Sequence, residues 1–236
     1  MTEPTLNRRP LASRSWPIMG RAAKRLAAAG ATPNGISILG VVSASLGAAA
    51  LAATGLASPA PWAHAALLVA AAAGIQGRLL CNLLDGMVAI EGGRKTPAGP
   101  LFNEAPDRVS DALLFAAAGL APGSSLAAGL LAGLLAVATA YIRELGRASG
   151  APADFGGPMA KQQRMALMTL ACLALAAAEP LRSWRFGGEP ARWCTLGDLQ
   201  AGPWAVVLAV ISVGSLLTCG RRLARAAQHL AKAGAA

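Results

Sequence analysis

The sequence has few aromatic and few charged side chains for its length. Of its 236 residues, 4% are aromatic and 14% are charged, whereas 55% are hydrophobic and the mean hydropathy is +0.49. A soluble domain carries about a quarter charged residues. This shortage of charge excludes a disordered chain and most soluble enzymes. With only 4 cysteines, the composition also excludes a disulfide scaffold, and these cysteines share no metal-ligand spacing.

The charged residues leave long stretches of the chain uncharged. These stretches are residues 26–77 (52 residues), 112–142 (31), 165–178 (14) and 199–220 (22). Because a membrane-spanning helix needs about 20 apolar residues, the first stretch holds two spans and the second also holds two. The third is short, but Arg164 can snorkel and lengthen it. We predict six transmembrane helices, at about 35–54, 62 to beyond 86, 99 to before 121, 126–144, 159–178 and 203–219.

A basic amphipathic helix is expected before the first span. Between Trp16 and Ala29, apolar residues recur at helical spacing against Arg21 and other basic residues, a pattern that suits a membrane surface. Thr32 is a candidate N-cap with Pro33 at the first helical position. The predicted fold class is therefore an all-α integral membrane protein with an N-terminal interfacial helix. The predicted segments are 1–33 (interfacial), 34–226 (six-helix domain) and 227–236 (cytoplasmic tail).

The formal net charge of +10 follows the positive-inside rule and does not indicate nucleic-acid binding. With the N-terminus inside, 17 of the 21 lysines and arginines lie on the inner side of the six predicted spans, and three lie outside. Arg78 falls within a span. Both termini are therefore expected in the cytoplasm.

Ionisable and amide side chains gather in two neighbouring spans, where they are costly and usually functional. The second span carries Arg78, Asn82 and Asp85, and the third carries Asn103, Glu104, Asp107, Arg108 and Asp111. At helical spacing each set lies mainly on one face. The two faces can meet near the cytoplasmic surface and offer oxygen ligands to a hard divalent cation. The alternative is that these residues only mark helix ends and pair with Arg78 and Arg108.

These residues resemble the signature of the CDP-alcohol phosphatidyltransferase family, D-x2-D-G-x2-A-R-x8-G-x3-D-x3-D. Here the pattern reads Asn82-x2-Asp85-Gly86-x2-Ala89-Ile90-x8-Gly99-x3-Asn103-x3-Asp107. All spacings match and five of the eight fixed positions are identical. The stretch from Ala31 to Ser37 also looks like the start of that family's first span.

The resemblance implies a phospholipid-synthesising enzyme. It would transfer a phosphatidyl group from CDP-diacylglycerol to an alcohol and release CMP. By resemblance, Asn82, Asp85, Asn103 and Asp107 would hold one or two Mg²⁺ or Mn²⁺ ions, and Asp107 would be the catalytic base. The donor would be bound by the following set: Thr32, Pro33, Asn34, Arg78, Gly86, Ala89, Arg94 and Gly99.

The resemblance also implies an acceptor side near the cytoplasmic ends of the later spans. Family members with phosphorylated acceptors, such as glycerol 3-phosphate or inositol phosphate, use cations there. The candidate acceptor-binding residues are Arg108, Asp111, Arg143, Lys161 and Arg164. Ordinary positive-inside flanking explains these cations equally well.

Three positions depart from the family pattern. Asn82 and Asn103 each replace an aspartate, and Ile90 replaces the arginine. Asp111, Glu91 or Glu104 could supply a missing carboxylate, and Arg78, Arg94 or Lys95 could supply the missing cation. The departures leave open a catalytically silent relative that binds CDP-lipid, and a small transporter is a third possibility. We expect a homodimer in a bacterial inner membrane with the site facing the cytoplasm.

Overall fold

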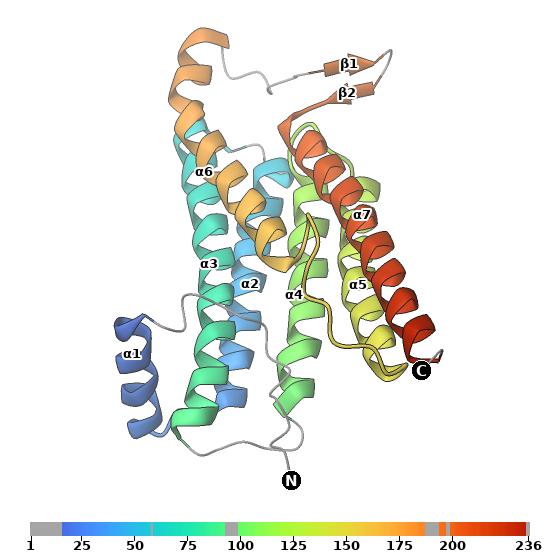
Figure 1. Ribbon diagram of the computed structural model, residues 1–236. Helices are drawn as coiled ribbons and strands as arrows, with labels where there is room; N and C mark the ends of the chain where they lie inside the picture. The colour runs from blue at the N-terminus through green and yellow to red at the C-terminus, as the bar shows by residue number, and fades with distance from the viewer. Residues whose placement is uncertain (1–15, 58, 93–98, 187–193, 197–198, 235–236) are drawn as a thin grey trace.

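The computed structural model describes residues 16–57, 59–92, 99–186, 194–196 and 199–234. Within these ranges the chain forms long helices and one short hairpin (Figure 1). The helices are α1 (Pro17–Ala28), α2 (Pro33–Leu56), α3 (Pro61–Glu91), α4 (Gly99–Leu120), α5 (Leu126–Ala148), α6 (Lys161–Phe186) and α7 (Pro203–Ala233). The hairpin strands are β1 (Cys194–Leu196) and β2 (Leu199–Ala201).

Two features of the fold go beyond the expected spans. The fold is helical as expected, but the stretch before α7 pairs in antiparallel register, with Thr195 opposite Gln200. In addition, α7 continues through the basic stretch to Ala233, because Arg221, Arg222 and Arg225 are good helix formers and no proline or turn signal interrupts them. The helix therefore crosses the boundary that we expected after residue 226.

The start of the first long helix is as predicted. Thr32 is extended, and its hydroxyl accepts a hydrogen bond from the backbone nitrogen of Gly35 at 3.1 Å. Pro33 then occupies the first helical position, where no backbone donor is needed. The helix start is thereby fixed, and Ser37 lies one turn further on.

Four of the helices are long and apolar enough to cross a membrane. They are α2, α3 (through Ile90), α5 and α7. Helix α4 carries Glu104, Asp107, Arg108 and Asp111 and is not among them, and neither is α6. The four apolar helices fit a membrane protein, and the count of six spans stays a prediction.

Large apolar side chains lie on the outside of the bundle as well as in its core. Leu39, Leu46, Leu134, Val213 and Leu216 are each more than half exposed on the outside of the bundle. Beside its hydrophobic core, the interior also holds charged residues, among them Arg78, Asp107, Asp111 and Arg164. Such an apolar exterior is typical of a surface that faces lipid.

Helix α2 occupies the centre of one half of the bundle. It packs extensively against both α3 and α4, whereas α3 and α4 touch each other only slightly. Helix α6 covers α3, and α5 with α7 covers α4 (Figure 1). The polar faces of α3 and α4 therefore meet beside the first turns of α2. The small helix α1 packs on α3 near Val88, and α1 and the end of α7 lie at the same end of the bundle.

Glycines allow α2 and α3 to approach closely. A Cβ atom added at Gly74 would lie 2.5 Å from the Cα atom of Gly47 and 2.8 Å from the carbonyl oxygen of Ser43. Small residues at helix contacts serve this purpose in membrane proteins. This contact sets how α3 lies against α2.

We therefore expect Gly74→Ala to destabilise the protein by about 1–3 kcal/mol, because backbone atoms must move apart. A lower thermal unfolding midpoint in detergent would show this. The matched control is Gly220→Ala on α7, where an added Cβ meets nothing within 4 Å. Equal midpoints for the two variants would contradict the close-packing explanation.

Candidate active site

The two predicted aspartates lie on facing helices and are both buried. Asp85 is 5% exposed near the end of α3, and Asp107 is 6% exposed in the first half of α4. Both side chains are within electrostatic reach of Arg78 and of each other. The convergence of the second and third predicted spans is thus present in the structure.

Asp107 is the centre of a cluster of donors. Its Oδ1 atom accepts a hydrogen bond from Nδ2 of Asn82 at 2.5 Å. The Arg78 guanidinium and the Lys161 ammonium contact the same oxygen, and Nη2 of Arg108 lies 3.8 Å from Oδ2. One carboxylate thus joins α3, α4 and α6. The alternative interpretation of the sequence expected these polar residues to pair with Arg78. The structure contains such a pair, between Arg78 and Asp107.

Asp85 has a different environment. Its Oδ2 atom accepts a 2.6 Å hydrogen bond from the hydroxyl of Ser37 on α2. Among the described residues, no lysine or arginine forms an ion pair with Asp85. Ser37 was not assigned a role from the sequence, although it lies in the Ala31–Ser37 stretch. Its position one turn after Pro33 is the only sequence signal for it.

A second buried ion pair lies deeper along α4. Nη2 of Arg164 donates to Oδ2 of Asp111 at 3.1 Å, and both side chains are 1% exposed. Nη1 of Arg164 also donates to Oγ1 of Thr139 and to the Met159 carbonyl oxygen. This pair ties α4, α5 and α6 together below the Asp107 cluster.

Two of the arginines predicted to bind the acceptor, Arg108 and Arg143, contact Glu104. Its Oε2 atom is 3.1 Å from Nη2 of Arg108 and 2.7 Å from Nη2 of Arg143. Arg143 also contacts Glu144 at 2.9 Å, and its guanidinium lies 5.1 Å from the centre of the Phe155 ring. Arg143 therefore connects α5 to the first turns of α4.

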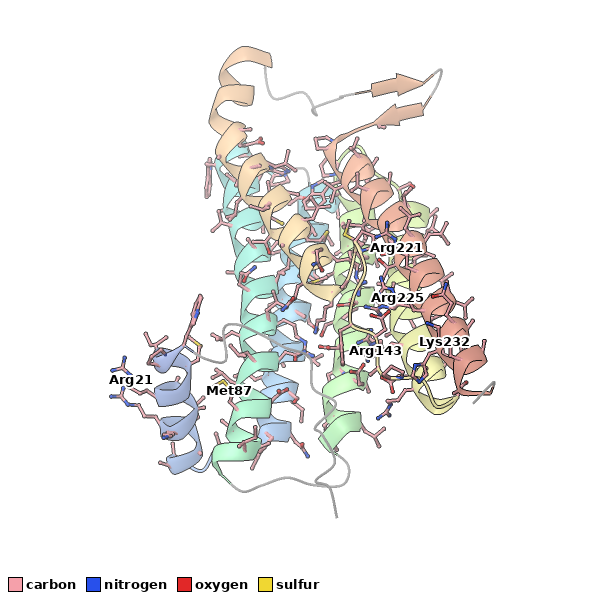
Figure 2. The ribbon with its side chains drawn as sticks, viewed as in Figure 1. Arg21, Met87, Arg143, Arg221, Arg225 and Lys232 are labelled. Atoms are coloured by element: carbon pink, nitrogen blue, oxygen red, sulfur yellow. The ribbon has the colours of Figure 1, made fainter. Side chains whose placement is uncertain are left out.

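A pocket opens on the other side of Arg143. Its volume is about 280 Å³, and it lies between α5, the segment after α5 and the basic part of α7. Arg143, Arg222, Arg225, His229 and Asp154 supply its polar lining. Figure 2 shows Arg143 and Arg225 lying between these elements, with Arg221 and Lys232 also on α7. The pocket is positively charged and suits an anion.

The other residues predicted to bind the CDP-linked donor lie at the starts of α2 and α4 and near the end of α3. Thr32, Pro33 and Asn34 form the first turn of α2. An added Cβ at Gly86 meets nothing within 4 Å, which leaves open space beside the α3 face. Ala89 is half-buried one turn further on. Gly99 begins α4.

Several predictions fall outside the part of the chain that can be described. Arg94 and Lys95 lie outside the described residues, and the side chains of Glu91 and Asn103 are not described, although their backbones are helical. On the opposite side of α3, Figure 2 shows Met87 between α3 and α1, with Arg21 pointing away from the bundle.

The oxygen-bearing side chains fit a hard divalent ion in chemical type. Asp85 and Asp107 offer carboxylates and Asn82 offers an amide oxygen, the ligands that Mg²⁺ and Mn²⁺ prefer. In number they are few, because the described residues contain no group of three or more histidine, cysteine, aspartate or glutamate side chains arranged around a metal. Asp85 is the carboxylate best placed to bind a divalent ion, since no described lysine or arginine forms an ion pair with it.

Three solved structures of Mycobacterium tuberculosis phosphatidylinositol phosphate synthase are similar to this structure. The form with CDP-DAG bound superposes with a TM-score of 0.64 at 23% identity, over 89% of this chain and 93% of the synthase chain. This chain has the fold of that synthase. The complex with manganese and citrate gives 0.64 over 88% of each chain, and the apo form 0.60 over 87% and 94%. No protein-family model and no curated protein matches the sequence.

The buried Asp111–Arg164 pair connects α4 to α6. We expect Asp111→Asn to lower stability by about 3–5 kcal/mol, because it leaves the Arg164 charge buried without a partner. The double variant Asp111→Asn/Arg164→Met should recover much of the loss. Thermal unfolding in detergent measures both.

The matched control removes an exposed pair. Arg225 lies 2.7 Å from Asp154, with side chains 51% and 23% exposed. Arg225→Met should cost at most about 1 kcal/mol. If Asp111→Asn is no more harmful than Arg225→Met, the deep pair does not hold α4 to α6.

Proposed function

We propose that this protein transfers the phosphatidyl group of CDP-diacylglycerol to an alcohol and releases CMP. The observation that carries the proposal is the meeting of two buried carboxylates, Asp85 and Asp107, between α3 and α4. The fold supports it, because the synthase with this fold has been solved with CDP-DAG bound. The signature spacing from Asn82 to Asp107 supports it independently.

The donor would bind at the ends of α2, α3 and α4. Thr32 caps α2, Pro33 has no backbone N–H, and the Asn34 backbone N–H lies at the N-terminal end of the helix, a position that favours phosphate oxygens. The small side chains at Gly86, Ala89 and Gly99 would leave room for the CDP-linked donor. Arg78 would add positive charge beside its phosphates. Arg94 is proposed for the donor from the sequence alone. The two acyl chains of the donor would remain in lipid beside the apolar exterior.

A divalent ion, Mg²⁺ or Mn²⁺, would be held by side chains from Asn82, Asp85, Asn103 and Asp107. The manganese complex of the similar synthase supports this assignment. When bound, such an ion neutralises diphosphate charge and aligns the reacting groups.

Asp107 is proposed as the base that accepts the proton of the acceptor hydroxyl. The acceptor oxygen then forms a bond to the phosphorus of the phosphatidyl group, and the bond from that phosphorus to the CMP oxygen breaks. Arg78 and Lys161, both in contact with Asp107, stabilise its ionised form, which is the form that can take a proton.

The acceptor would bind on the side of α5 and α6. The proposed residues are Arg108, Asp111, Arg143, Lys161 and Arg164. Lys161 and Arg108 contact Asp107, so they could hold an anionic acceptor beside the base. Arg143 links this region to the basic pocket. This charge favours a phosphorylated polyol such as glycerol 3-phosphate or inositol phosphate.

The topology proposed from the sequence accompanies this function. Residues 1–33 would lie at the inner membrane surface, 34–226 would form the six-span domain and 227–236 the tail. Helix α1, with its exposed Trp16 side and basic face, supports the interfacial placement. We propose a bacterial inner-membrane location, a cytoplasmic site and a homodimer.

The central test is CMP release by purified protein supplied with CDP-diacylglycerol, Mg²⁺ or Mn²⁺ and a panel of alcohols. We expect wild-type activity with at least one alcohol. Asp107→Asn and Asp85→Asn should each abolish it, because the base and the ion ligand are lost. The control is Glu179→Gln, which removes a buried carboxylate beside His64, about 30 Å from Asp85 along α3.

If no alcohol gives CMP above the Asp107→Asn level, a silent CDP-lipid-binding relative is the better description. The cations on Asp107 and the asparagines at 82 and 103 are the features that favour that alternative. Solute flux in proteoliposomes would instead indicate the transporter.

The acceptor assignment makes a separate prediction. Arg143→Met should raise KM for a phosphorylated acceptor about tenfold or more while leaving KM for the CDP-linked donor unchanged, because one cation facing the acceptor is lost. Arg147→Met on the same helix, where Arg147 is 57% exposed, is the control and should change neither value. An equal effect on donor KM would contradict the assignment.

A further inference from the structure

The carboxylates of the site differ in whether a lysine or arginine side chain pairs with them. Asp107 contacts Arg78 and Lys161, and Asp111 pairs with Arg164. Glu104 pairs with Arg108 and Arg143. Among the described carboxylates of this cluster, only Asp85 has a neutral partner instead, the Ser37 hydroxyl.

Arg78 is a built-in part of this arrangement. Its side chain is 1% exposed, and α2 has a glycine where Arg78 lies against it. A Cβ added at Gly40 would lie 2.6 Å from Nη1 of Arg78. Its Nε and Nη1 atoms have no hydrogen-bond partner among the described residues, so Asp107 uses only part of its donor capacity.

A divalent ion at Oδ1 of Asp107 would therefore meet two side-chain cations and one amide donor at the same oxygen. Like charges at such short range repel strongly in a buried site. The asparagines at positions 82 and 103 also remove the two negative charges that one further divalent ion would need. At Asp85 this repulsion is weaker, because no described cation forms an ion pair with that carboxylate and Arg78 acts on it only from a greater distance.

We propose that the site takes a single divalent ion at Asp85, and that Arg78 and Lys161 supply the fixed positive charge beside Asp107. The inference rests on the proposed function, because the ion and the two cations together would face the diphosphate of a CDP-linked donor. Arg78 thus acts in place of an ion, and it remains when all divalent ions are removed.

The test counts ions directly. Full-length protein in nanodiscs is titrated with Mn²⁺ in the presence of saturating CDP, and free Mn²⁺ is measured by electron paramagnetic resonance. Wild type should bind one Mn²⁺ per chain, and Asp85→Asn should bind none. Arg147→Met, which removes an exposed cation from α5, should still bind one.

A variant with less positive charge around Asp107 tests whether a second ion can then bind. Arg78→Met/Asn82→Asp lowers the charge around Asp107 by two and should raise the count to two ions per chain. Lys161→Met/Asn82→Asp makes the same change from α6 and serves if the first variant does not fold. A folded variant that still binds one ion overturns the charge-replacement argument.

The wild-type count decides the inference by itself. Two ions in wild type that binds CDP overturn the inference and leave the proposed function standing. CDP bound without any Mn²⁺ overturns the inference together with the metal requirement of the proposed function. If wild type binds neither CDP nor Mn²⁺, the proposed function falls together with the inference. CDP binding that persists in EDTA and is weakened at least tenfold by Arg78→Met, but less by Arg78→Lys, further supports the role of Arg78.

Discussion

The contact of Asp107 with cations from two other helices is the interaction on which the site depends. A carboxylate buried in an apolar bundle is tolerated only when its charge is compensated. Arg78 on α3 and Lys161 on α6 supply that compensation, and Asn82 adds a neutral donor. The same contacts fix the relative positions of three helices, so the electrostatics and the architecture of the site have one origin.

The placement of α2 follows from packing and prepares this contact. Glycines at 47 and 74 bring α2 close to α3, and Gly40 leaves room for the Arg78 side chain. Ser37, in the same helix, reaches Asp85. The first span is thus a wall of the site, although the sequence signature lies entirely on the next two helices.

Much of the fold can be predicted from the sequence because it depends on local signals. Charge-free stretches predict the apolar helices α2, α3, α5 and α7, and Thr32 with Pro33 predicts the start of α2. The one-sided spacing of Asn82, Asp85 and Asp107 predicted their convergence. The contact between Lys161 and Asp107 could not be predicted in this way, because it depends on how α6 packs across α3. The hairpin at 194–201 also lacked a periodic signal, and the six-span count, Arg94 and the Asn103 side chain stay predictions.

The fold is shared with a solved synthase, and the buried cluster carries a charge pattern that departs from the family signature at Asn82, Asn103 and Ile90. In this cluster, two cations contact Asp107, and Asp85 is the described carboxylate without an ion pair. This pattern is consistent with an enzyme that grips a diphosphate partly with its own side chains.

The most direct measurement is an experimental structure with CDP and Mn²⁺ bound, with the metal located by anomalous scattering. The account predicts one manganese peak at Asp85 and the diphosphate between α3 and α4, beside Arg78 and Lys161. A nucleotide bound elsewhere, or Asp85 and Asp107 turned apart toward lipid, would contradict it.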